Sequence, residues 1–204
     1  MNELIIGIST TALGVVGTLT AIWLKYHLEK RKKQEEECPV HCAVADDKEI
    51  IARLDEIKEE IGADRVSIFS FHNGGEYYSG KSMQKLTCSY EVVSPGVARQ
   101  QLAMQNVPVS ACHVTLQKLM ENKEFHCYDV DQNYPESGCK SYLVDFGVKS
   151  TYQYCIFDLN RRAIGLLRAD FVLEREELSD EGHAAMKYTA IKLSGYLIGN
   201  NKTK

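Results

Sequence analysis

The feature that most constrains this chain is an uncharged run near its N-terminus, from Leu4 to Leu24. At about 1.5 Å per residue, a helix over this run reaches roughly 31 Å, the thickness of a bilayer's hydrocarbon core. Only a helix pairs all of its own backbone groups in lipid over such a length. Trp23 and Tyr26 stand at the end of the run, where aromatic rings favour the headgroup level. The run therefore predicts a transmembrane anchor over residues 1–24.

Two other interpretations of the run fit less well. A cleaved signal peptide needs a basic start, a shorter apolar stretch and small residues at a cleavage site, whereas this chain begins Met-Asn-Glu and its run ends at Trp23 and Leu24. A buried core helix would keep a polar stripe, and the run offers only Ser and Thr. We expect the anchor to be retained.

Basic residues follow the run directly, and they are Lys25, Lys30, Arg31, Lys32 and Lys33. Positive charge beside a span is retained on the cytoplasmic side of a membrane. We therefore expect a single-pass protein of the inner or cell membrane, with its C-terminal domain in the cytoplasm. The lipid bilayer is its first predicted partner.

Small residues recur along one side of the run, at Gly7, Thr11, Gly14 and Thr18. Small residues at three- and four-residue spacing let membrane helices approach closely. The pattern predicts a pairing face and a homodimer or higher homo-oligomer, although Gly and Thr are also common in membrane helices.

Composition limits the rest of the chain to a single domain. The formal net charge is -4 over 204 residues, which gives no basic footprint for nucleic acid. We place the domain at residues 46–199, with a basic juxtamembrane helix and linker at 25–45 and a tail at 200–204.

Seven cysteines are present, an odd number that cannot all pair within one chain. Cys88, Cys112 and Cys155 fall in apolar patterns, where a free Cys behaves as a small hydrophobic residue. Free thiols suit a reducing compartment and agree with a cytoplasmic domain, whereas an exported domain could form disulfides.

The linker carries a possible metal site. Pro39 is expected to interrupt the charged helix, because proline cannot continue one, and residues 37–45 are predicted to be a hinge. Cys38, His41 and Cys42 offer thiolates and an imidazole, which suit zinc or the iron of haem. The alternatives are a linker with reactive thiols or an intermolecular disulfide.

Hydrophobic periodicity predicts an α+β domain. The expected strands span residues 65–71, 86–93, 125–130, 150–158 and 163–173, and the expected helices span 46–61, 97–106, 110–121, 135–146 and 179–196. His72 to Gly75 is expected to be a turn, followed by a polar, aromatic loop from Glu76 to Lys81. The strands should form one antiparallel sheet flanked by helices, with the first and last helices packed together on one face.

That segment order resembles a GAF domain, a sensor fold related to PAS. The stretches that carry the resemblance are Gly62-Ala-Asp-Arg-Val-Ser-Ile-Phe69 and Arg162-Ala-Ile-Gly-Leu-Leu-Arg-Ala-Asp170. The resemblance implies a ligand pocket between the sheet and the helices that face it. Its candidate lining residues are Phe69, Phe71, His72, Asn73, Tyr90, Cys112 and Tyr154.

Two of these candidates have simpler interpretations. His72 could contact a ligand beside Gly74 and Gly75, or it could stand in a loop whose glycines supply positive φ. Cys112 and His113 are similar to the Cys-His pair to which some bilin-binding GAF domains attach their chromophore. The alternative is a buried Cys beside an exposed His.

A second, fainter resemblance is to the holin of T-even phages, over Arg65–Asn73 and Tyr154–Tyr196. It implies a lysis protein with its soluble domain outside the cytoplasm, against the orientation that the basic residues indicate. No nucleophile with a base, phosphate loop or pair of catalytic carboxylates stands out. The sequence thus predicts a membrane-tethered binding or sensor module that is not an enzyme, with a small molecule or a protein as its partner, and a holin-like lysis protein is the alternative.

Overall fold

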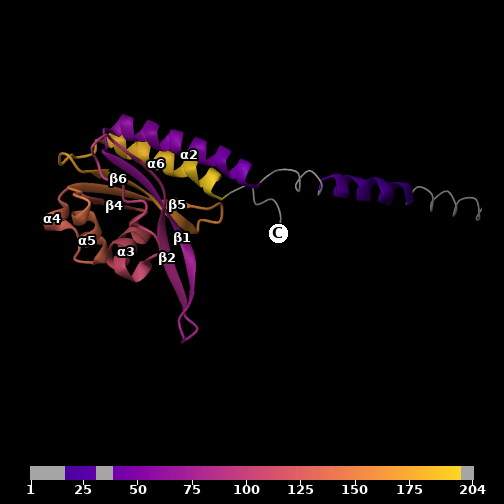
Figure 1. The fold of residues 1–204 in the computed structure, drawn as a ribbon, viewed down its shortest axis with the longest axis horizontal. Coiled ribbons are helices and arrows are strands. Elements are labelled where there is room, and N and C mark those ends of the chain that lie inside the picture. Colours follow the sequence, from indigo (N-terminus) through magenta and orange to yellow (C-terminus); the bar gives the residue numbers. More distant parts are fainter. Residues whose placement is uncertain (1–16, 31–38, 199–204) are drawn as a thin grey trace, which may run out of the picture. The chain divides into compact units, whose positions relative to one another are not determined.

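A computed structural model of the chain describes residues 17–30 and 39–198, with the backbone alone for residues 39–42 (Figure 1). The chain forms two compact units, Met1–Asp46 and Asp47–Lys204. In the first unit, residues 17–30 are helical. Most of the predicted anchor, including Gly7, Thr11 and Gly14, lies outside the described residues, and Thr18 lies in this helix. Within the described ranges, no helix is both long and apolar enough to cross a membrane.

The predicted hinge is wrong over residues 39–45, because helix α2 runs from Pro39 to Ile61. Proline is tolerated in the first turn of a helix, where its missing N–H has no partner to lose. The helix therefore also begins before the predicted start at Asp46. Cys38 lies outside the described residues, and His41 and Cys42 lie on the helical backbone of α2.

The expected apolar stripe of α2 is confirmed. Ile50, Leu54 and Ile57 are all buried, and Gly62 ends the helix with a φ of 66°. That backbone conformation is open to glycine at little cost, which is why the helix stops there.

Six strands form one antiparallel sheet in the order β3-β2-β1-β6-β5-β4. Their bounds are β1 Arg65–Glu76, β2 Ser82–Val93, β3 Val107–Pro108, β4 Glu124–Cys127, β5 Ser150–Phe157 and β6 Ala163–Phe171. The predicted α+β class, with an antiparallel sheet flanked by helices, is confirmed. β1 and β6 lie side by side at the centre although β6 is the last strand in the chain.

The predicted turn from His72 to Gly75 is instead part of β1. The pairing of β1 with β2 shifts register between Asn73 and Glu76, and Gly75 adopts a φ of 105° there. The glycines thus serve a bulge within the strand rather than its end. The hairpin closes further on, where the Tyr77 N–H donates to the Lys81 carbonyl at 2.8 Å. Figure 1 shows this hairpin extending beyond the rest of the sheet.

Helices cover both faces of the sheet (Figure 1). α2 and α6 lie on one face, and the helices that follow β3 and β4 lie on the other. The remaining helices are η1 Val109–Cys112, α3 His113–Asn122, α4 Val130–Asn133, α5 Gly138–Asp145 and α6 Asp180–Leu197. The predicted cap of the last helix is confirmed, because the Ser179 hydroxyl accepts a hydrogen bond from the Gly182 N–H at 3.1 Å.

The helix expected at residues 97–106 is absent from this described part of the chain, which forms turns. The Glu91 carboxylate accepts from the backbone N–H groups of Gln100 at 2.9 Å and Gln101 at 3.3 Å. A buried side chain thus satisfies backbone donors that a helix would have paired with its own carbonyls.

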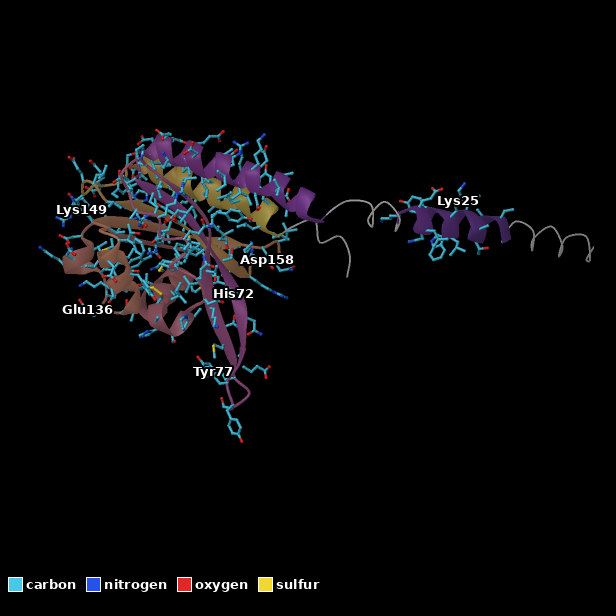
Figure 2. The ribbon with its side chains drawn as sticks, viewed as in Figure 1. Lys25, His72, Tyr77, Glu136, Lys149 and Asp158 are labelled. Carbon is cyan, nitrogen blue, oxygen red and sulfur yellow. A yellow bond between two sulfur atoms is a disulfide. The ribbon has the colours of Figure 1, made fainter. Side chains whose placement is uncertain are left out.

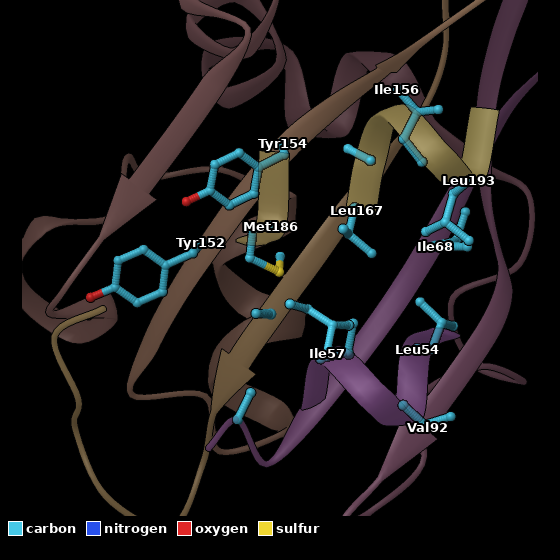
Figure 3. Close-up of a cluster of buried hydrophobic side chains, with 14 of the residues drawn as sticks. Leu54, Ile57, Ile68, Val92, Tyr152, Tyr154, Ile156, Leu167, Met186 and Leu193 are labelled. Atoms are coloured by element: carbon cyan, nitrogen blue, oxygen red, sulfur yellow. The ribbon is translucent and has the colours of Figure 1, made fainter. Parts of the chain in front are cut away.

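The first and last helices share one core against the sheet, as the sequence predicts. Leu54 and Ile57 of α2 meet Met186 and Leu193 of α6 over the strand residues Ile68, Tyr152, Tyr154, Ile156 and Leu167 (Figure 3). A change in α6 therefore acts directly on the side chains that hold α2.

Candidate functional site

The opposite sheet face, under α3 to α5, holds a buried network of charged groups. Arg65 and Asp170 are fully buried, and Glu91 and Arg168 are nearly so. Strand alternation places them together: Arg65 lies on β1, Arg168 and Asp170 on β6, and Glu91 on β2. A register shift between Ile68 and Phe69 brings Glu91 opposite Ser67 on this same face.

Asp170 is the centre of this network. Its carboxylate accepts from Arg168 Nε at 3.1 Å, from Arg65 Nη1 at 3.3 Å and from the Thr151 hydroxyl at 2.7 Å. Glu91 lies 3.6 Å from Arg65 Nε. The two guanidinium groups and two carboxylates balance in charge, as buried ions must if they are to remain ionised.

Gln100 ties the network to the irregular segment above the sheet. Its side-chain oxygen accepts from Arg168, and its amide donates to the Ser67 hydroxyl at 3.2 Å. Arg65 also donates to the Ala98 carbonyl at 2.9 Å. The polar network therefore fixes a segment that has no secondary structure of its own.

The cavity beside this network is very small. It has a volume of about 20 Å³ and is lined by Phe69, Cys112, Thr115 and Arg168, among others. This is about the room of one water molecule, far below the roughly 300–1,000 Å³ of small-molecule sites. The Thr115 hydroxyl is buried there with no hydrogen-bond partner among the described residues. A single water is the occupant that the cavity fits.

A disulfide joins Cys112 to Cys139 at the roof of this cavity. The expectation of free cysteines is therefore wrong for Cys112, because Cys139, in the first turn of α5, lies at a Cα–Cα distance of 5.1 Å from it. His113 beside it is exposed, as the simpler interpretation expects.

The described free cysteines, Cys88, Cys127 and Cys155, are all buried. Burial raises the pKa of the Cys88 thiol to about 12 and that of Cys155 to about 11. Burial also raises the pKa of Cys127. A thiol that stays protonated at neutral pH is a poor nucleophile and a poor ligand, so these residues act as core side chains.

A second group of polar side chains lies at the β4 edge, on the face that α6 covers. The Tyr154 hydroxyl is hydrogen-bonded to His183 Nδ1, and the ring centroids of His183 and His126 lie 4.4 Å apart. Glu124 lies 3.6 Å from His126 Nε2 and 2.9 Å from Lys187 Nζ. Burial, followed by the neighbouring His183, lowers the pKa of His126, and burial raises the pKa of Tyr154.

A groove of about 580 Å³ opens beside this group, between the end of β5 and α6. Tyr154 and Cys155 contribute to its lining from β5, and Ala190 and Ile191 from α6. Its volume falls within the range of small-molecule sites. It is also more than ten times larger than the cavity under α3 to α5.

The structure separates the seven candidate pocket residues. Phe69, Phe71 and Cys112 belong to one apolar cluster under α3 to α5. Tyr154 and Tyr90 lie on the opposite face, where Tyr90 donates to Asp47 at 2.6 Å.

His72 and Asn73 lie on the hairpin. The His72 ring is hydrogen-bonded to the Thr87 hydroxyl at 2.8 Å, and the Asn73 side chain accepts from Gly75 N at 3.0 Å. Figure 2 shows His72 and Tyr77 along this hairpin, with Tyr77 near its tip. The His72 and Asn73 side chains thus each have a hydrogen-bond partner within the hairpin, and the seven candidate residues do not share one cavity.

The charged network was not found from the sequence. Its one visible signal is the presence of Arg65, Arg168 and Asp170 within apolar strand patterns. Charged residues on the inner face of a strand are rarely buried unless they are paired.

No family model matches the sequence, and no curated protein matches it. Solved structures do match. A far-red cyanobacteriochrome photoreceptor gives a TM-score of 0.60 at 14% identity, over 89% of this chain and 98% of that chain. The phycocyanobilin-bound GAF domain from a cyanobacterial phytochrome gives 0.57 at 19% identity, over 86% of this chain and 94% of that chain. The fold is GAF-like.

A third match is the cyanobacteriochrome receptor PixJ, with a TM-score of 0.59 at 15% identity, over 76% of this chain and 96% of that chain. The GAF-like fold that the segment order predicts is thus confirmed. The comparisons give no support to the holin resemblance.

Proposed function

We propose that this chain is a binding and sensing module of GAF-like fold, without enzymatic activity, tethered to a membrane by the predicted N-terminal anchor. The observation that carries the proposal is the core shared by α2 and α6 against one sheet face. A ligand or partner that changes the packing of α6 would bias α2, and α2 leads back along the chain toward the anchor. This is a population shift between two packings.

The matched structures support a sensing role at the level of fold. Two of them are bilin-bound GAF domains, carrying phycocyanobilin or phycoerythrobilin. The space under α3 to α5 in this chain holds about 20 Å³, far below the roughly 300–1,000 Å³ of small-molecule sites. We therefore propose a sensor of something other than a bilin.

The setting of the module is part of the proposal. Lys25 and the cluster from Lys30 to Lys33 favour a cytoplasmic domain. Pairing of the anchor through its small residues would make the module a dimer. We propose no nucleic-acid partner, because nucleic acid is bound by basic surfaces and this chain has a net charge of -4. Zinc or haem at Cys38, His41 and Cys42 stays a prediction.

The membrane setting can be tested with two reporters fused to the C-terminus of the full chain. One reporter is active only in the periplasm and the other only in the cytoplasm. We expect cytoplasmic activity in the membrane fraction and no lysis of the cells. A periplasmic signal together with lysis would instead support the holin-like alternative, and a signal in the soluble fraction would contradict the tether.

The coupling of α6 to α2 can be tested by hydrogen exchange on the full chain in lipid nanodiscs. Met186→Ala removes a fully buried side chain of α6 and should speed exchange in residues 50–61 of α2. Leu143→Ala removes a buried side chain of α5 on the other face and serves as the matched control. Equal effects of both variants on α2, once their stabilities are matched, would contradict a specific path through α6.

A further inference from the structure

The disulfide between Cys112 and Cys139 presents its two members unequally to solvent. Cys112 is 2% exposed, whereas Cys139 is only partly buried against the same apolar cluster. Cys139 is therefore the member of the pair that a thiol in solution reaches. Thiol–disulfide exchange depends on which sulfur is attacked and on access to it. The difference in burial thus directs attack to Cys139 and makes Cys112 the leaving group.

Both sulfur atoms lie where a thiolate is stabilised. Cys112 is the N-cap residue of α3, and Cys139 lies in the first turn of α5. The N-terminus of a helix carries about half a positive charge, which favours a thiolate beside it. The Thr115 hydroxyl lines the same cavity and is buried with no hydrogen-bond partner among the described residues. It can donate to a thiolate on Cys112, which makes that sulfur a good leaving group.

The surrounding structure accommodates the reduced pair as well as the bond. Two unbonded sulfur atoms need more room than two bonded ones, and both cysteines line the cavity of about 20 Å³. The bond joins the start of α3 to the start of α5 and lies outside the strands. These helices are also held by the buried Leu119 and Leu143. Breaking the bond therefore releases one contact between covering helices and leaves the sheet intact.

Gly138 lets the two segments that carry the cysteines approach closely. A Cβ at this position would lie 3.2 Å from the Cβ of Ala111 and 3.5 Å from its carbonyl oxygen. Ala111 directly precedes Cys112 in the chain, and Gly138 directly precedes Cys139. A methyl group between the two segments would crowd them, because packed interiors have little free space. The missing side chain thus permits the Cα–Cα distance that the bond needs.

The free thiols that the structure describes do not compete for this bond. Cys88, Cys127 and Cys155 are all buried, and burial raises the pKa of each thiol. The thiolate is the attacking species in exchange, so these three residues stay protonated and unreactive at neutral pH. A reversible change of oxidation state is therefore confined to one pair in the described part of the domain.

We propose that Cys112 and Cys139 form a thiol–disulfide exchange site for a low-molecular-weight thiol of the glutathione class. The small thiolate attacks the Cys139 sulfur, the bond to Cys112 breaks, and Cys112 leaves with the electron pair and takes a proton from water. A second small thiolate attacks the sulfur of the first, which releases the small disulfide and leaves Cys139 as a thiolate. Two small thiols are thereby oxidised and the protein disulfide is reduced.

The small disulfide drives the same two steps in reverse, so the pair follows the ratio of small thiol to small disulfide around it. This inference goes beyond the proposed function, because the pair lies on the sheet face opposite α2 and α6. The oxidation state of the pair sets whether the start of α5 is bonded to the start of α3 over the cavity.

The test uses the full chain in nanodiscs, with Cys38→Ser and Cys42→Ser to remove the two remaining thiols. The chain is equilibrated in buffers of reduced and oxidised glutathione, quenched in acid, and alkylated under denaturing conditions for peptide mass spectrometry. We expect excess reduced glutathione to open the bond without denaturant and excess oxidised glutathione to restore it, while Cys88, Cys127 and Cys155 stay unmodified. A bond that opens only after unfolding, or one that never forms in oxidised glutathione, would overturn the inference.

The attacked sulfur is identified by trapping the mixed disulfide. Short exposure of the bonded pair to reduced glutathione should leave the adduct on Cys139. In the presence of oxidised glutathione, the adduct on Cys139 in Cys112→Ala should form at least about ten-fold faster than the adduct on Cys112 in Cys139→Ala, because Cys112 is buried. An adduct trapped on Cys112, or equal rates in the two variants, would contradict the proposed direction of attack.

Gly138→Ala tests the close approach that the bond requires. We expect the glutathione ratio at half oxidation to shift about five-fold toward oxidised glutathione, since the added methyl group crowds Ala111 in the bonded state. Gly195→Ala is the matched control, because its Cβ would meet open space, and it should leave the ratio unchanged. Equal ratios in the two variants would contradict the geometry on which the inference rests.

Discussion

At the scale of single residues, Asp170 is the carboxylate that the buried guanidinium groups share. It accepts from Arg65, Arg168 and Thr151 while fully buried. Asp170→Ala would leave two guanidinium groups without their shared anion. We expect the free energy of unfolding to fall by about 3–5 kcal/mol, measured by urea unfolding. The exposed Asp131→Ala should change it by less than about 0.5 kcal/mol, and a similar small effect for Asp170→Ala would contradict the network.

His126 predicts a dependence of stability on pH. Burial and the neighbouring His183 lower its pKa below the ordinary value of 6.5. The unfolded chain therefore binds this proton more readily than the folded chain, and stability is lost as the pH falls through this range. Between about pH 7.5 and pH 5.5, the urea midpoint of His126→Gln should fall less than that of the unaltered chain. His113→Gln, at an exposed position, should keep the full dependence.

Sequence reasoning reached part of the residue-scale picture. The family resemblance grouped Phe69 with Cys112 as pocket candidates, and both lie in one apolar cluster. Sequence reasoning missed the pairing of Arg65 with Asp170, because the two are 105 positions apart in the chain. Only the adjacency of β1 and β6 brings them together, and periodicity carries no information about which strands are neighbours.

At the scale of elements, two glycines predict opposite effects of the same substitution. A Cβ on Gly165 of β6 would overlap the Phe69 carbonyl of the neighbouring strand, whereas a Cβ on Gly195 of α6 would meet open space. Gly165→Ala should lower the free energy of unfolding by about 1–3 kcal/mol. Gly195→Ala should raise it by roughly 0.5–1 kcal/mol, because alanine favours helix. Thermal unfolding measures both, and equal signs would show that β6 is not held against β1 as described.

Elements were predicted well where one pattern dominates. The strands at residues 150–158 and 163–173, and the helix capped by Ser179, each combine periodicity with a clear start or stop. The predicted element bounds are wrong where one residue type is compatible with two local structures. Pro39 begins a helix as readily as it ends one, and glycine serves a bulge as readily as a turn. Residues 97–106 follow the Glu91 carboxylate, a contact outside their own segment.

At the scale of the whole molecule, the order of helices and strands predicted a GAF-like fold, although no family model matches the amino-acid sequence. This chain and the far-red cyanobacteriochrome photoreceptor share a fold at 14% sequence identity. The fold depends on where the apolar faces of its elements lie rather than on which apolar residues form them. Nothing in that order specifies a ligand. The candidate pocket came from the family resemblance, and side-chain packing fills that space here.

The orientation of the chain and the state of its disulfide should change together. The basic cluster from Lys30 to Lys33 favours a cytoplasmic domain, where thiols are kept reduced, while the sulfur atoms of Cys112 and Cys139 are placed to bond. In cells, we expect an alkylating reagent added under denaturing conditions to label Cys112 and Cys139 as thiols. Replacing residues 30–33 by Gln should export part of the population, activate the periplasmic reporter and protect both cysteines. Labelling that stays unchanged while the periplasmic reporter turns on would contradict the bond, and a reporter that stays off would contradict the orienting role of the basic cluster.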